Sequence, residues 1–491
     1  MSVLKESCGV VGAINGGGEV VDRVWLALLA LQHRGQESFG IYTHDGERFS
    51  QRKKLGLING LENFSHLRGN IGIGHVRYST IGKSAEELLR QDSAVTDKFA
   101  QPFFIDYQRR GIAFCHNGNI VNTLSLSKSL LSSGIFLSSE CDAEVILKTM
   151  VCELLKTSDI ENSLKSCMGK LEGAYSAVAM TGEGEVLAFR DPYGFRPLCF
   201  GENEDLSIFA SESVALNVNG IDTLTDVKPG ELIVIRPDQK PWRRRVYPCE
   251  RKAHCMFEYV YFSRPDSILN GRDVYAARIK LGVNLARSYE TKADVIVPVP
   301  DTARPAAEGI SRETGIQVAE GLIKNRYVGR TFIMPEQQAR DDSVNVKLNP
   351  VQSVLKDKSV ILVDDSIVRG TTSKKIVNMI KKAGAKHVEV WITCPPIKSP
   401  CFYGIDIATH AELIAANKTV PQISRTIGAD KLCYQTLEGL VDAIGVAPEH
   451  LCLACLTGDY PTPTAQKIAD LMKMKRPGGM RYYEIALEGL T

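Results

Sequence analysis

The sequence predicts two consecutive folded domains, an α+β domain followed by a doubly wound α/β domain. Up to about residue 235, short strands separated by turns are interrupted by only two apolar segments of helical periodicity, which is an α+β pattern. Beyond about residue 270, buried β-branched runs alternate with helices, and this alternation predicts a parallel sheet covered on both faces. The length of 491 residues agrees, because roughly 100–200 residues per domain corresponds to two to four domains.

The composition is that of a globular protein. A hydrophobic fraction of 44% and a charged fraction of 24% exclude a disordered chain, a collagen and a coiled coil. The net charge of +2 lacks the basic excess of a nucleic-acid-binding protein. Residues 1–9 contain no basic segment followed by an apolar one, and the apolar run 24–31 is shorter than the ~20 residues that a membrane span needs. We therefore expect a cytoplasmic protein that binds neither nucleic acid nor membrane.

The elements of the first domain follow from apolar runs separated by turns. The expected strands are 8–14, 71–75, 111–116, 174–180, 186–189 and 232–235, and the expected helices are 21–32 and 144–155. Residues 237–251 are polar and contain prolines, and their densest charge is the run from Trp242 to Arg245, so we expect a solvated connector. The first domain is therefore assigned to residues 8–235 and the connector to residues 236–270.

The second domain, residues 271–458, consists of strand and helix pairs. The strands 295–299, 360–363 and 388–393 are followed by helices at 305–314, 371–383 and 410–417. The strands are apolar and mostly β-branched, as expected for strands buried on both faces. Residues 459–491 are assigned to a terminal helix and tail.

The strongest local signal is the run 360–372, in which an apolar strand ends in Asp364 and Asp365 and a small polar turn enters a helix. Ligands of open α/β sheets bind at the carboxyl ends of the strands. The backbone N–H groups and hydroxyls of the turn can surround a phosphate at the helix N-terminus. The two carboxylates can accept from sugar hydroxyls or hold Mg²⁺. A charged turn without a ligand is the alternative, but adjacent carboxylates repel each other and favour a cation or a polyol.

This run resembles the ribose-phosphate signature of the type I phosphoribosyltransferases, whose substrate is phosphoribosyl pyrophosphate. A second anion site is expected where the strand 295–299 leads into a helix, and the basic segment 324–331 is expected to close over a polyanion rather than to be merely solvated. The resemblance implies one Mg²⁺ per subunit at Thr302, Asp364 and Asp365. The residues that it implies for binding phosphoribosyl pyrophosphate are Asp301, Lys324, Arg326, Tyr327, Arg330, Asp364, Asp365, Ser366, Arg369, Gly370, Thr371 and Thr372.

Cys8 begins the first expected strand. Alone, a cysteine in a strand is more often a small buried hydrophobic residue. If residues 1–7 were removed as a propeptide, the freed α-amino group of Cys8 would lie beside the thiol. Its ordinary pKa of about 7.7–8.0 suits proton transfer at neutral pH. Polar clusters further along the chain favour this second interpretation.

The polar clusters complete a predicted pocket. The Asn117 side chain and the Gly118 N–H can form an oxyanion hole, and Arg77 and Asp142 can bind the carboxylate and amino groups of an amino acid. Together these residues resemble a class II glutamine amidotransferase, an N-terminal-nucleophile domain. By that resemblance, the catalytic residues are Cys8, Asn117 and Gly118, and the glutamine-binding residues are Arg34, Arg77, Thr80 and Asp142. Two positions depart from the family pattern: Cys141 stands where Ser is usual, and Ser7 stands where an acidic residue is common.

The two motif sets, in this order and over nearly the full length, resemble the amidophosphoribosyltransferase family. The resemblance implies hydrolysis of glutamine at Cys8 through a thioester and passage of ammonia through an internal channel to C1 of phosphoribosyl pyrophosphate. The products are 5-phosphoribosylamine, glutamate and pyrophosphate, in the first committed step of de novo purine synthesis. Tyr259, Tyr261 and the segment 324–331 are expected to help build the path. The resemblance also implies a homotetramer with feedback inhibition by purine nucleotides.

Two other functions are compatible with part of this sequence pattern. The first is a regulator that binds phosphoribosyl pyrophosphate or nucleotides without turnover, and the Cys8 pocket argues against it. The second is an amidotransferase with a different acceptor, and the phosphoribosyl signature disfavours it. A glutaminase assay separates the first from the enzyme.

The 13 cysteines are expected to be free, catalytic or metal-bound rather than paired, because the chain lacks an export signal. The Cys452 and Cys455 spacing is compatible with zinc, an iron–sulfur cluster or a redox pair. The surrounding residues resemble the iron–sulfur branch of the family, which implies one structural [4Fe–4S] cluster per subunit. Its ligands would be Cys255, Cys401, Cys452 and Cys455, whereas Cys249, Cys394 and Cys433 are not expected to be ligands.

Overall fold

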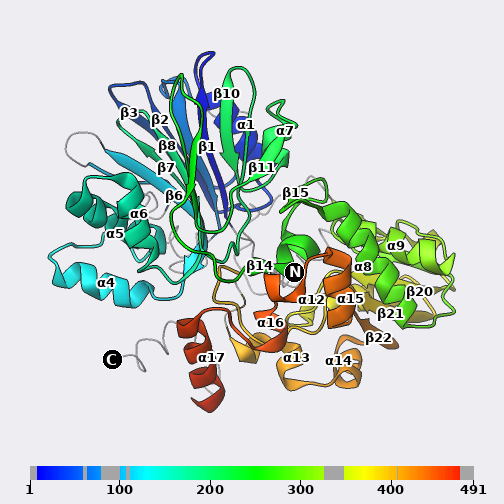
Figure 1. Cartoon of the computed structure of the whole chain (residues 1–491). Helices are drawn as coiled ribbons and strands as arrows, with labels where there is room; N and C mark the ends of the chain where they lie inside the picture. Colours follow the sequence, from blue (N-terminus) through cyan, green and yellow to red (C-terminus); the bar gives the residue numbers. More distant parts are fainter. Residues whose placement is uncertain are drawn as a thin grey trace.

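The computed structural model describes residues 8–58, 63–78, 100–106, 111–325, 348–405, 407 and 409–475. Figure 1 shows a domain of two stacked sheets and, beside it, a domain built on a smaller sheet between helices. Among the helices of the described ranges, none combines the length and the apolar character of a membrane span.

The first domain contains two antiparallel sheets. Its strands are β1 (Gly9–Asn15), β2 (Ser38–His44), β3 (Phe49–Leu55), β4 (Ile71–Arg77), β5 (Phe103–Ile105), β6 (Ile112–Ile120), β7 (Gly173–Thr181), β8 (Val186–Arg190), β9 (Cys199–Glu202), β10 (Leu206–Ala210), β11 (Leu224–Asp226), β12 (Glu231–Ile235) and β13 (Trp242–Arg245). One sheet has the order β11-β9-β10-β1-β4-β2-β3 and the other β13-β12-β8-β7-β6-β5. Val10 and Ile73 of one sheet meet Val178 and Ile233 of the other in a shared core. A Cβ on Gly12 would lie 2.3 Å from Val178, so the two sheets approach closely at this glycine.

Helices cover the outer faces of both sheets. The helices of this domain are α1 (Val21–Ala30), α4 (Thr123–Ser132), α5 (Asp142–Thr157), α6 (Ile160–Met168) and α7 (Val214–Asn217). The first sheet packs against α1 and α7, and the second against α4, α5 and α6. The resulting order of layers is helix, sheet, sheet, helix, as Figure 1 shows, and it confirms the predicted α+β class.

The basic run from Trp242 to Arg245, expected in a solvated connector, forms the edge strand β13. Its residues pair in antiparallel register with β12, from Val234 opposite Trp242 to Glu231 opposite Arg245. All four side chains are exposed. Exposed charged side chains suit an edge strand, because they discourage pairing with another chain.

The second domain is built on a parallel sheet, confirming the doubly wound class. Its main strands, in sheet order, are β17 (Val295–Pro298), β20 (Ser359–Asp364), β21 (His387–Ile392) and β22 (Lys431–Tyr434). Its main helices are α8 (Val274–Ser288), α9 (Arg304–Thr314), α12 (Thr371–Lys382), α14 (Val420–Ile427) and α15 (Leu437–Ile444). Alternate residues of β20 face opposite sides: Ile361 and Val363 pack with α8 and α9, and Val360 and Leu362 pack with α12 and α14.

Smaller elements complete this domain and differ in one place from expectation. They are β15 (Ile268–Leu269), β16 (Arg272–Asp273), β18 (Leu322–Lys324), β19 (Leu348–Pro350), α11 (Gln352–Leu355), η2 (His410–Glu412) and α13 (Ile414–Asn417). The helix predicted at 410–417 is divided between η2 and α13, and the longer helix before β22 is α14. The latter begins at a capping box formed by Thr419 and Gln422 and has a proline in its first turn, so its start is fixed locally.

The two domains share a buried junction. Its elements are β14 (His254–Cys255), η1 (Glu258–Phe262), η3 (Pro448–His450), β23 (Leu451–Cys452), α16 (Ala454–Thr457) and α17 (Pro463–Lys475). Strands β14 and β23 pair in parallel, with Cys255 opposite Cys452. Ala174 and Phe195 of the first domain pack in one apolar cluster with Phe402 and Ile468. The terminal segment therefore packs against both domains.

Candidate active sites

Cys8 lies at the start of β1, almost fully buried, with 8% of its surface exposed. Its Sγ is 3.4 Å from the backbone N and 3.4 Å from the backbone O of Tyr78, which follows β4. Nε of Arg34 donates to the Cys8 carbonyl oxygen at 3.0 Å. Burial raises the pKa of the thiol to about 11, although the nearby charge of Arg77 opposes the rise. The thiol is therefore protonated at neutral pH, and a nucleophilic role requires a base.

Asn117 and Gly118 lie on β6. The Asn117 side chain is fully buried, and neither its Oδ1 nor its Nδ2 has a hydrogen-bond partner among the described residues. An unsatisfied buried polar group costs about 1–3 kcal/mol, so such a group needs an explanation, and a ligand is one. Gly118 has φ +145°, and a Cβ there would lie 2.0 Å from the carbonyl oxygen of Ala174, so the position requires glycine. Both features suit the oxyanion hole expected here.

Arg77 and Asp142 supply opposite charges near Cys8. Arg77 ends β4 and Asp142 begins α5, and each influences the pKa of the Cys8 thiol. Burial alone would raise the pKa of Asp142, but the imidazole of His116, 3.2 Å away, and further hydrogen bonds hold it below its usual value. The carboxylate is therefore ionised at neutral pH. Thr80, also expected to bind glutamine, lies outside the described residues.

A buried ion-pair network, missed by the sequence analysis, surrounds Arg34. Its guanidinium contacts Glu212 and donates to Glu258 at 2.8 Å, and Arg196 donates to the same Glu258 oxygen at 3.0 Å. Burial alone would raise the pKa of Glu258, but the guanidiniums of Arg34 and Arg196 outweigh it and lower the pKa. The network fixes the arginine that holds the Cys8 carbonyl. No sequence pattern could reveal it, because Arg34 and Glu258 are 224 positions apart.

The π-helix η1 connects this network to the second domain. Glu258 is its first residue, and the carbonyls of Tyr259 and Tyr261 accept from Arg278 of α8 at 2.8 and 3.0 Å. Burial lowers the pKa of Arg278 to about 10, while the charge of Asp365 opposes that shift. One buried helix thus joins the arginine network beside the expected nucleophile to an arginine close to the expected ribose site.

The chain after Cys401 packs directly on the expected oxyanion residues. Nδ2 of Asn119 donates to the carbonyl oxygen of Phe402 at 2.8 Å. A Cβ on Gly404 would lie 3.0 Å from the carbonyl carbon of Gly118. The segment that carries one expected cluster ligand therefore supports the turn of β6 at the glutaminase site.

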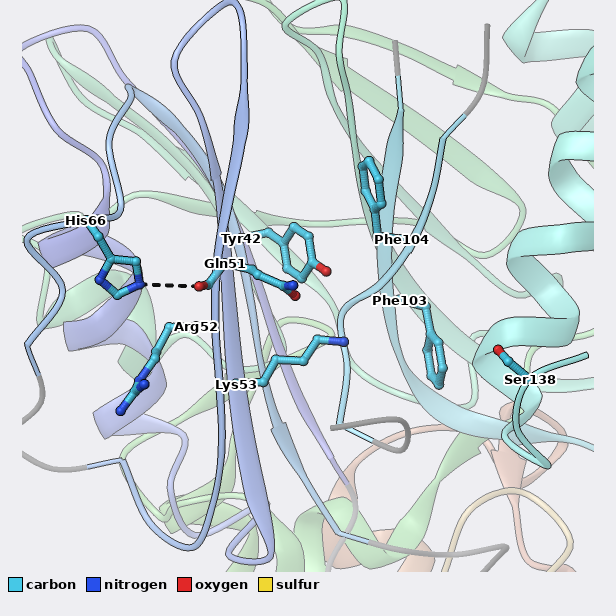
Figure 2. A pocket seen from close by; sticks show the side chains of 8 residues that line it. All are labelled: Tyr42, Gln51, Arg52, Lys53, His66, Phe103, Phe104 and Ser138. Atoms are coloured by element: carbon cyan, nitrogen blue, oxygen red, sulfur yellow. Dashed lines mark hydrogen bonds between the residues drawn. The ribbon is translucent and has the colours of Figure 1, made fainter. Parts of the chain in front are cut away.

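A separate cavity of about 500 Å³ lies at the edge of the first sheet (Figure 2). Nζ of Lys53 lies 5.6 Å from the ring centres of both Tyr42 and Phe103, and His66 contacts the carbonyl oxygen of Gln51 at 3.3 Å. None of the predicted site residues is among the residues that line this cavity. It therefore contributes no evidence on the catalytic chemistry.

In the second domain, Asp364 ends β20 and Asp365 follows it, as the sequence predicts. Oδ2 of Asp365 accepts from the Thr302 hydroxyl at 2.6 Å, and Oδ1 accepts from the Ser366 hydroxyl at 2.7 Å. Burial raises the pKa of both carboxyl groups, and the charge of Asp365 raises that of Asp364 further. A bound cation would relieve this repulsion. Asp364, Asp365 and Thr302 form an all-oxygen set, which suits Mg²⁺.

The turn 366–372 leads into α12. Gly370 precedes the helix with φ +77°, and Thr371 and Thr372 occupy its first turn. The first N–H groups of a helix lack intrahelical partners and can bind a phosphate. The Arg369 side chain forms an ion pair with Glu412 and points its charge to that partner in this structure.

Of the residues expected to bind the pyrophosphate group, only some lie within the described ranges. The bond between Pro300 and Asp301 is a cis peptide. Nζ of Lys324 lies 2.8 Å from Asp301, so these two predicted residues are brought together. The other predicted residues of this segment, Arg326, Tyr327 and Arg330, lie outside the described residues.

The four cysteines expected to bind a cluster come from three segments and lie close together. Burial raises the pKa of each of the four thiols. For Cys455, the charges of Cys401, Cys452 and Cys255 raise it further. Nη1 of Arg196 lies 3.9 Å from Sγ of Cys255. Within the described ranges, however, no three His, Cys, Asp or Glu side chains are arranged to hold a metal ion.

Comparison with known protein families finds one matching domain family in each half of the chain. A glutamine amidotransferase domain model matches residues 89–218, and a phosphoribosyl transferase domain model matches residues 265–400. The fold and the two sites thus define a glutamine amidotransferase domain joined to a phosphoribosyltransferase domain.

Relatives share this arrangement over nearly their whole length. The chain is 44% identical to the amidophosphoribosyltransferase of Methanothermobacter thermautotrophicus over 479 residues, which are 96% of this chain and 98% of the relative. It is 46% identical to that of Methanocaldococcus jannaschii over 473 residues, with coverages of 93% and 98%. The glutamine phosphoribosylpyrophosphate amidotransferase of B. subtilis, solved in complex with ADP and GMP, superposes with a TM-score of 0.84 at 40% identity, covering 93% of this chain and 98% of the other. The chain belongs to the amidophosphoribosyltransferase family.

Proposed function

We propose that the chain hydrolyses glutamine at Cys8 and transfers the ammonia to C1 of phosphoribosyl pyrophosphate. The products are glutamate, pyrophosphate and 5-phosphoribosylamine, and the reaction is the first committed step of de novo purine synthesis. The observation that carries the proposal is the presence of two sites in one chain. In the first domain lie a buried thiol and a buried amide that has no hydrogen-bond partner among the described residues, and in the second domain adjacent carboxylates end a parallel strand.

The first half-reaction requires a matured chain, from which residues 1–7 have been removed once to free the α-amino group of Cys8. This amine has an ordinary pKa of about 7.7–8.0 and accepts the proton of the buried thiol as the sulfur attacks the glutamine carboxamide. Nδ2 of Asn117 and the N–H of Gly118 donate to the oxyanion of the tetrahedral intermediate. The Cys8 ammonium group returns this proton to the amide nitrogen as the intermediate collapses, so the C–N bond breaks and ammonia leaves. Water then hydrolyses the thioester to glutamate.

Side chains of opposite charge bind the two charged groups of the glutamine substrate. Arg77 and Thr80 bind the α-carboxylate of glutamine, and Asp142, ionised at neutral pH, binds its α-ammonium group. Arg34 fixes the Cys8 backbone through its carbonyl and thus the direction of the freed amine.

The second half-reaction takes place at the carboxyl ends of the parallel strands. Asp364 and Asp365 accept from the ribose hydroxyls, and with Thr302 they would hold one Mg²⁺ per subunit, which supplies electrostatic stabilisation of the leaving pyrophosphate. The 5-phosphate-binding turn is formed by Ser366, Arg369, Gly370, Thr371 and Thr372. The pyrophosphate-binding residues are Asp301, Lys324, Arg326, Tyr327 and Arg330. Ammonia attacks C1 as the bond to pyrophosphate breaks, so positioning and charge stabilisation dominate.

The two half-reactions are coupled through η1. Its first residue, Glu258, forms an ion pair with Arg34, whose Nε donates to the Cys8 carbonyl oxygen. Further along η1, the carbonyl oxygen of Tyr261 accepts from Arg278, whose pKa is influenced by the charge of Asp365. Closure of the segment 324–331 over the substrate would complete a path for ammonia beside Tyr259 and Tyr261 and keep it from water.

The chemistry of the four cysteine side chains fits one structural [4Fe–4S] cluster per subunit, although within the described ranges they are not arranged around a metal position in this structure. Thiolate sulfur is the usual ligand of iron–sulfur clusters. Cys255 and Cys452 are paired strand neighbours, Cys401 and Cys455 lie close to them, and Arg196 brings positive charge to the sulfurs. A cluster would join three segments that are far apart in sequence, and a disulfide could not replace it in the reducing cytoplasm, where we place this enzyme.

Regulation and assembly are proposed by analogy with the relatives. The B. subtilis relative was solved with ADP and GMP. We therefore expect feedback inhibition of this chain by purine nucleotides. The homotetramer remains an expectation from the family resemblance of the sequence.

A double dissociation tests the proposed function. Cys8→Ala is expected to abolish glutamine-dependent synthesis of phosphoribosylamine and to leave synthesis from a high concentration of free ammonia intact. Asp365→Asn is expected to abolish both syntheses and to leave basal glutaminase activity. Equal loss of all activities in both folded variants would contradict the assignment of two sites.

A further inference from the structure

A second cavity, of about 590 Å³, lies at the junction of the two domains. One wall comes from the first domain and includes Arg190 at the end of β8 and Lys228 after β11. The other wall comes from the second domain and includes Arg272 of β16 and His450 of η3. In Figure 1, the strands β11 and β15 lie at this junction. The backbone N–H of Asn270, after β15, donates to the carboxylate of Asp226, in β11, at 3.1 Å. The volume is within the ~300–1,000 Å³ typical of small-molecule sites.

This cavity is distinct from both proposed substrate sites. None of the residues to which the proposed function assigns a role is among those that line it. Whatever binds here therefore does not compete directly for glutamine or for phosphoribosyl pyrophosphate, and the inference below is independent of the proposed function.

The lining is strongly cationic. Five lining side chains carry positive charge, and one carries a carboxylate, that of Asp226. The cationic residues are Arg190, Lys228, Arg243, Lys252 and Arg272. Like charges that share a confined space repel one another, and the repulsion grows as the local dielectric constant falls. Burial, together with the charges of Arg190, Lys252 and His450, lowers the pKa of His254 to about 3, so His254 is neutral at pH 7 and adds no positive charge to the cavity.

Three of these cations have no charged partner in the described structure. Arg243 pairs with Glu231 at 3.0 Å, outside the cavity lining. Lys228, Lys252 and Arg272, by contrast, form no ion pair and no side-chain hydrogen bond within the described ranges. All three side chains are exposed at the rim.

Arg190 forms the inner wall and is held rigidly. It is 1% exposed, and its two terminal nitrogens donate to the carbonyls of Val227 and Gly194 at 3.0 and 2.8 Å. Its Nε has no hydrogen-bond partner among the described residues. Arg190 is thus a fixed positive charge at the base of the cavity, whereas the three exposed cations at the rim would become ordered only when an anion binds.

We propose that this cavity binds a small phosphorylated molecule whose phosphate oxygens accept from Lys228, Lys252 and Arg272. A phosphate ester carries about 1.5 to 2 negative charges at pH 7, so one or two phosphates match three unpaired cations better than a single carboxylate does. The guanidinium of Arg272 suits bidentate binding of phosphate, whereas the lysines act as point charges. Because Lys228 and Arg272 belong to different domains, the ligand fixes the two domains relative to each other.

The test uses the full chain and inorganic tripolyphosphate as the probe, in calorimetric titrations without Mg²⁺. The pocket variant combines Lys228→Ala, Lys252→Ala and Arg272→Ala. The matched control combines Lys128→Ala, Lys165→Ala and Lys240→Ala, which removes the same charge from exposed positions elsewhere. The pocket variant is expected to lose one binding component or to weaken it at least tenfold, whereas the control binds as the unchanged protein does.

A third variant separates this cavity from the phosphoribosyl site. Lys324→Ala combined with Arg369→Ala is expected to keep the component that the pocket variant loses. Equal binding by the pocket variant and its control, or loss of all binding in the Lys324 and Arg369 variant, would overturn the proposal. The single variant Arg272→Ala, expected to weaken the same component, provides the test if the triple variant fails to fold, as judged by its melting curve.

Discussion

Replacing Glu258 by Gln is expected to destabilise the protein strongly, because this carboxylate neutralises buried arginines. Glu258 is 2% exposed, and its oxygens accept from Arg34 at 2.8 and 3.0 Å and from Arg196 at 3.0 Å. Glutamine keeps the shape of the side chain and removes its negative charge. Arg34 then keeps Glu212 as a carboxylate partner, whereas Arg196 keeps no carboxylate partner among the described residues, and both guanidinium side chains are 0% exposed.

The size of the effect follows from this charge count. Removal of one partner from a buried ion pair leaves an uncompensated buried charge and costs about 3–5 kcal/mol. For domains of 150–250 residues, each kcal/mol corresponds to about 2–4 °C, so the melting temperature is expected to fall by about 6–20 °C. The matched control is Glu313→Gln. Its partner Arg287 lies at 3.0 Å but is 64% exposed, and an exposed pair contributes little, so no measurable change is expected.

The assay combines thermal melting with steady-state kinetics. Because Glu258 holds the arginine that fixes the Cys8 carbonyl, glutamine-dependent kcat/KM is expected to fall at least tenfold, and ammonia-dependent synthesis is expected to fall less. A melting temperature equal to that of Glu313→Gln would refute the charge argument. An equal fall of both activities in the folded variant would refute the positioning role.

Three further predictions concern the same sites. Arg34 and Arg196 hold the pKa of Glu258 below its ordinary value of 4.5, so the stabilising contribution of this carboxylate is present above pH 4.5 and is lost as the pH falls further. The melting temperatures of the wild type and of Glu258→Gln should therefore converge in acid. A constant difference between them down to pH 3 would contradict this prediction. Gly118→Ala should reduce glutaminase activity by about 10²–10³-fold, as loss of one oxyanion donor does, while ammonia-dependent synthesis persists. The control is Gly134→Ala, which also has a positive φ but has open space around it. Similar losses of glutaminase activity in both variants would count against the oxyanion role of Gly118. Cys452→Ser should abolish the iron and labile sulfide of anaerobically purified protein, whereas Cys249→Ser should retain both; iron-free wild type, or one stoichiometric zinc, would exclude the cluster.

Local sequence pattern was sufficient to predict the fold classes and the position of the Asp364 and Asp365 pair at the end of a strand. The β-branched run that ends in Asp364 and Asp365 predicts a buried strand with its carboxylates at the ligand-binding edge, and β20 has that form. Such features are visible in sequence because strand burial, turn chemistry and helix capping depend on neighbours a few residues away. The helix predicted at 410–417 shows the limit, since the Thr419 capping box a few residues later begins the longer helix.

The Arg34, Glu212, Glu258 and Arg196 network was decided only by tertiary structure. The resemblance assigned Arg34 to the glutamine site, but no local sequence pattern pairs it with the other three residues, and a charged residue is ordinarily expected at the surface. They are buried because β-sheet packing and the junction helix η1 bring them together and allow each charge to be compensated. The cationic cavity has the same origin, because Lys228 and Arg272 meet only when the two domains pack.

The sequence by itself determined which chemical groups this protein possesses: a thiol at Cys8, a carboxylate pair at Asp364 and Asp365, and the thiols of Cys255, Cys401, Cys452 and Cys455. The tertiary structure decided which of these groups lie close enough to act together and what lies between them. The physical reason is one of range. Propensity and periodicity act over a few residues along the chain, whereas electrostatic compensation and close packing act over a few ångströms in space, between residues that can be more than 200 positions apart.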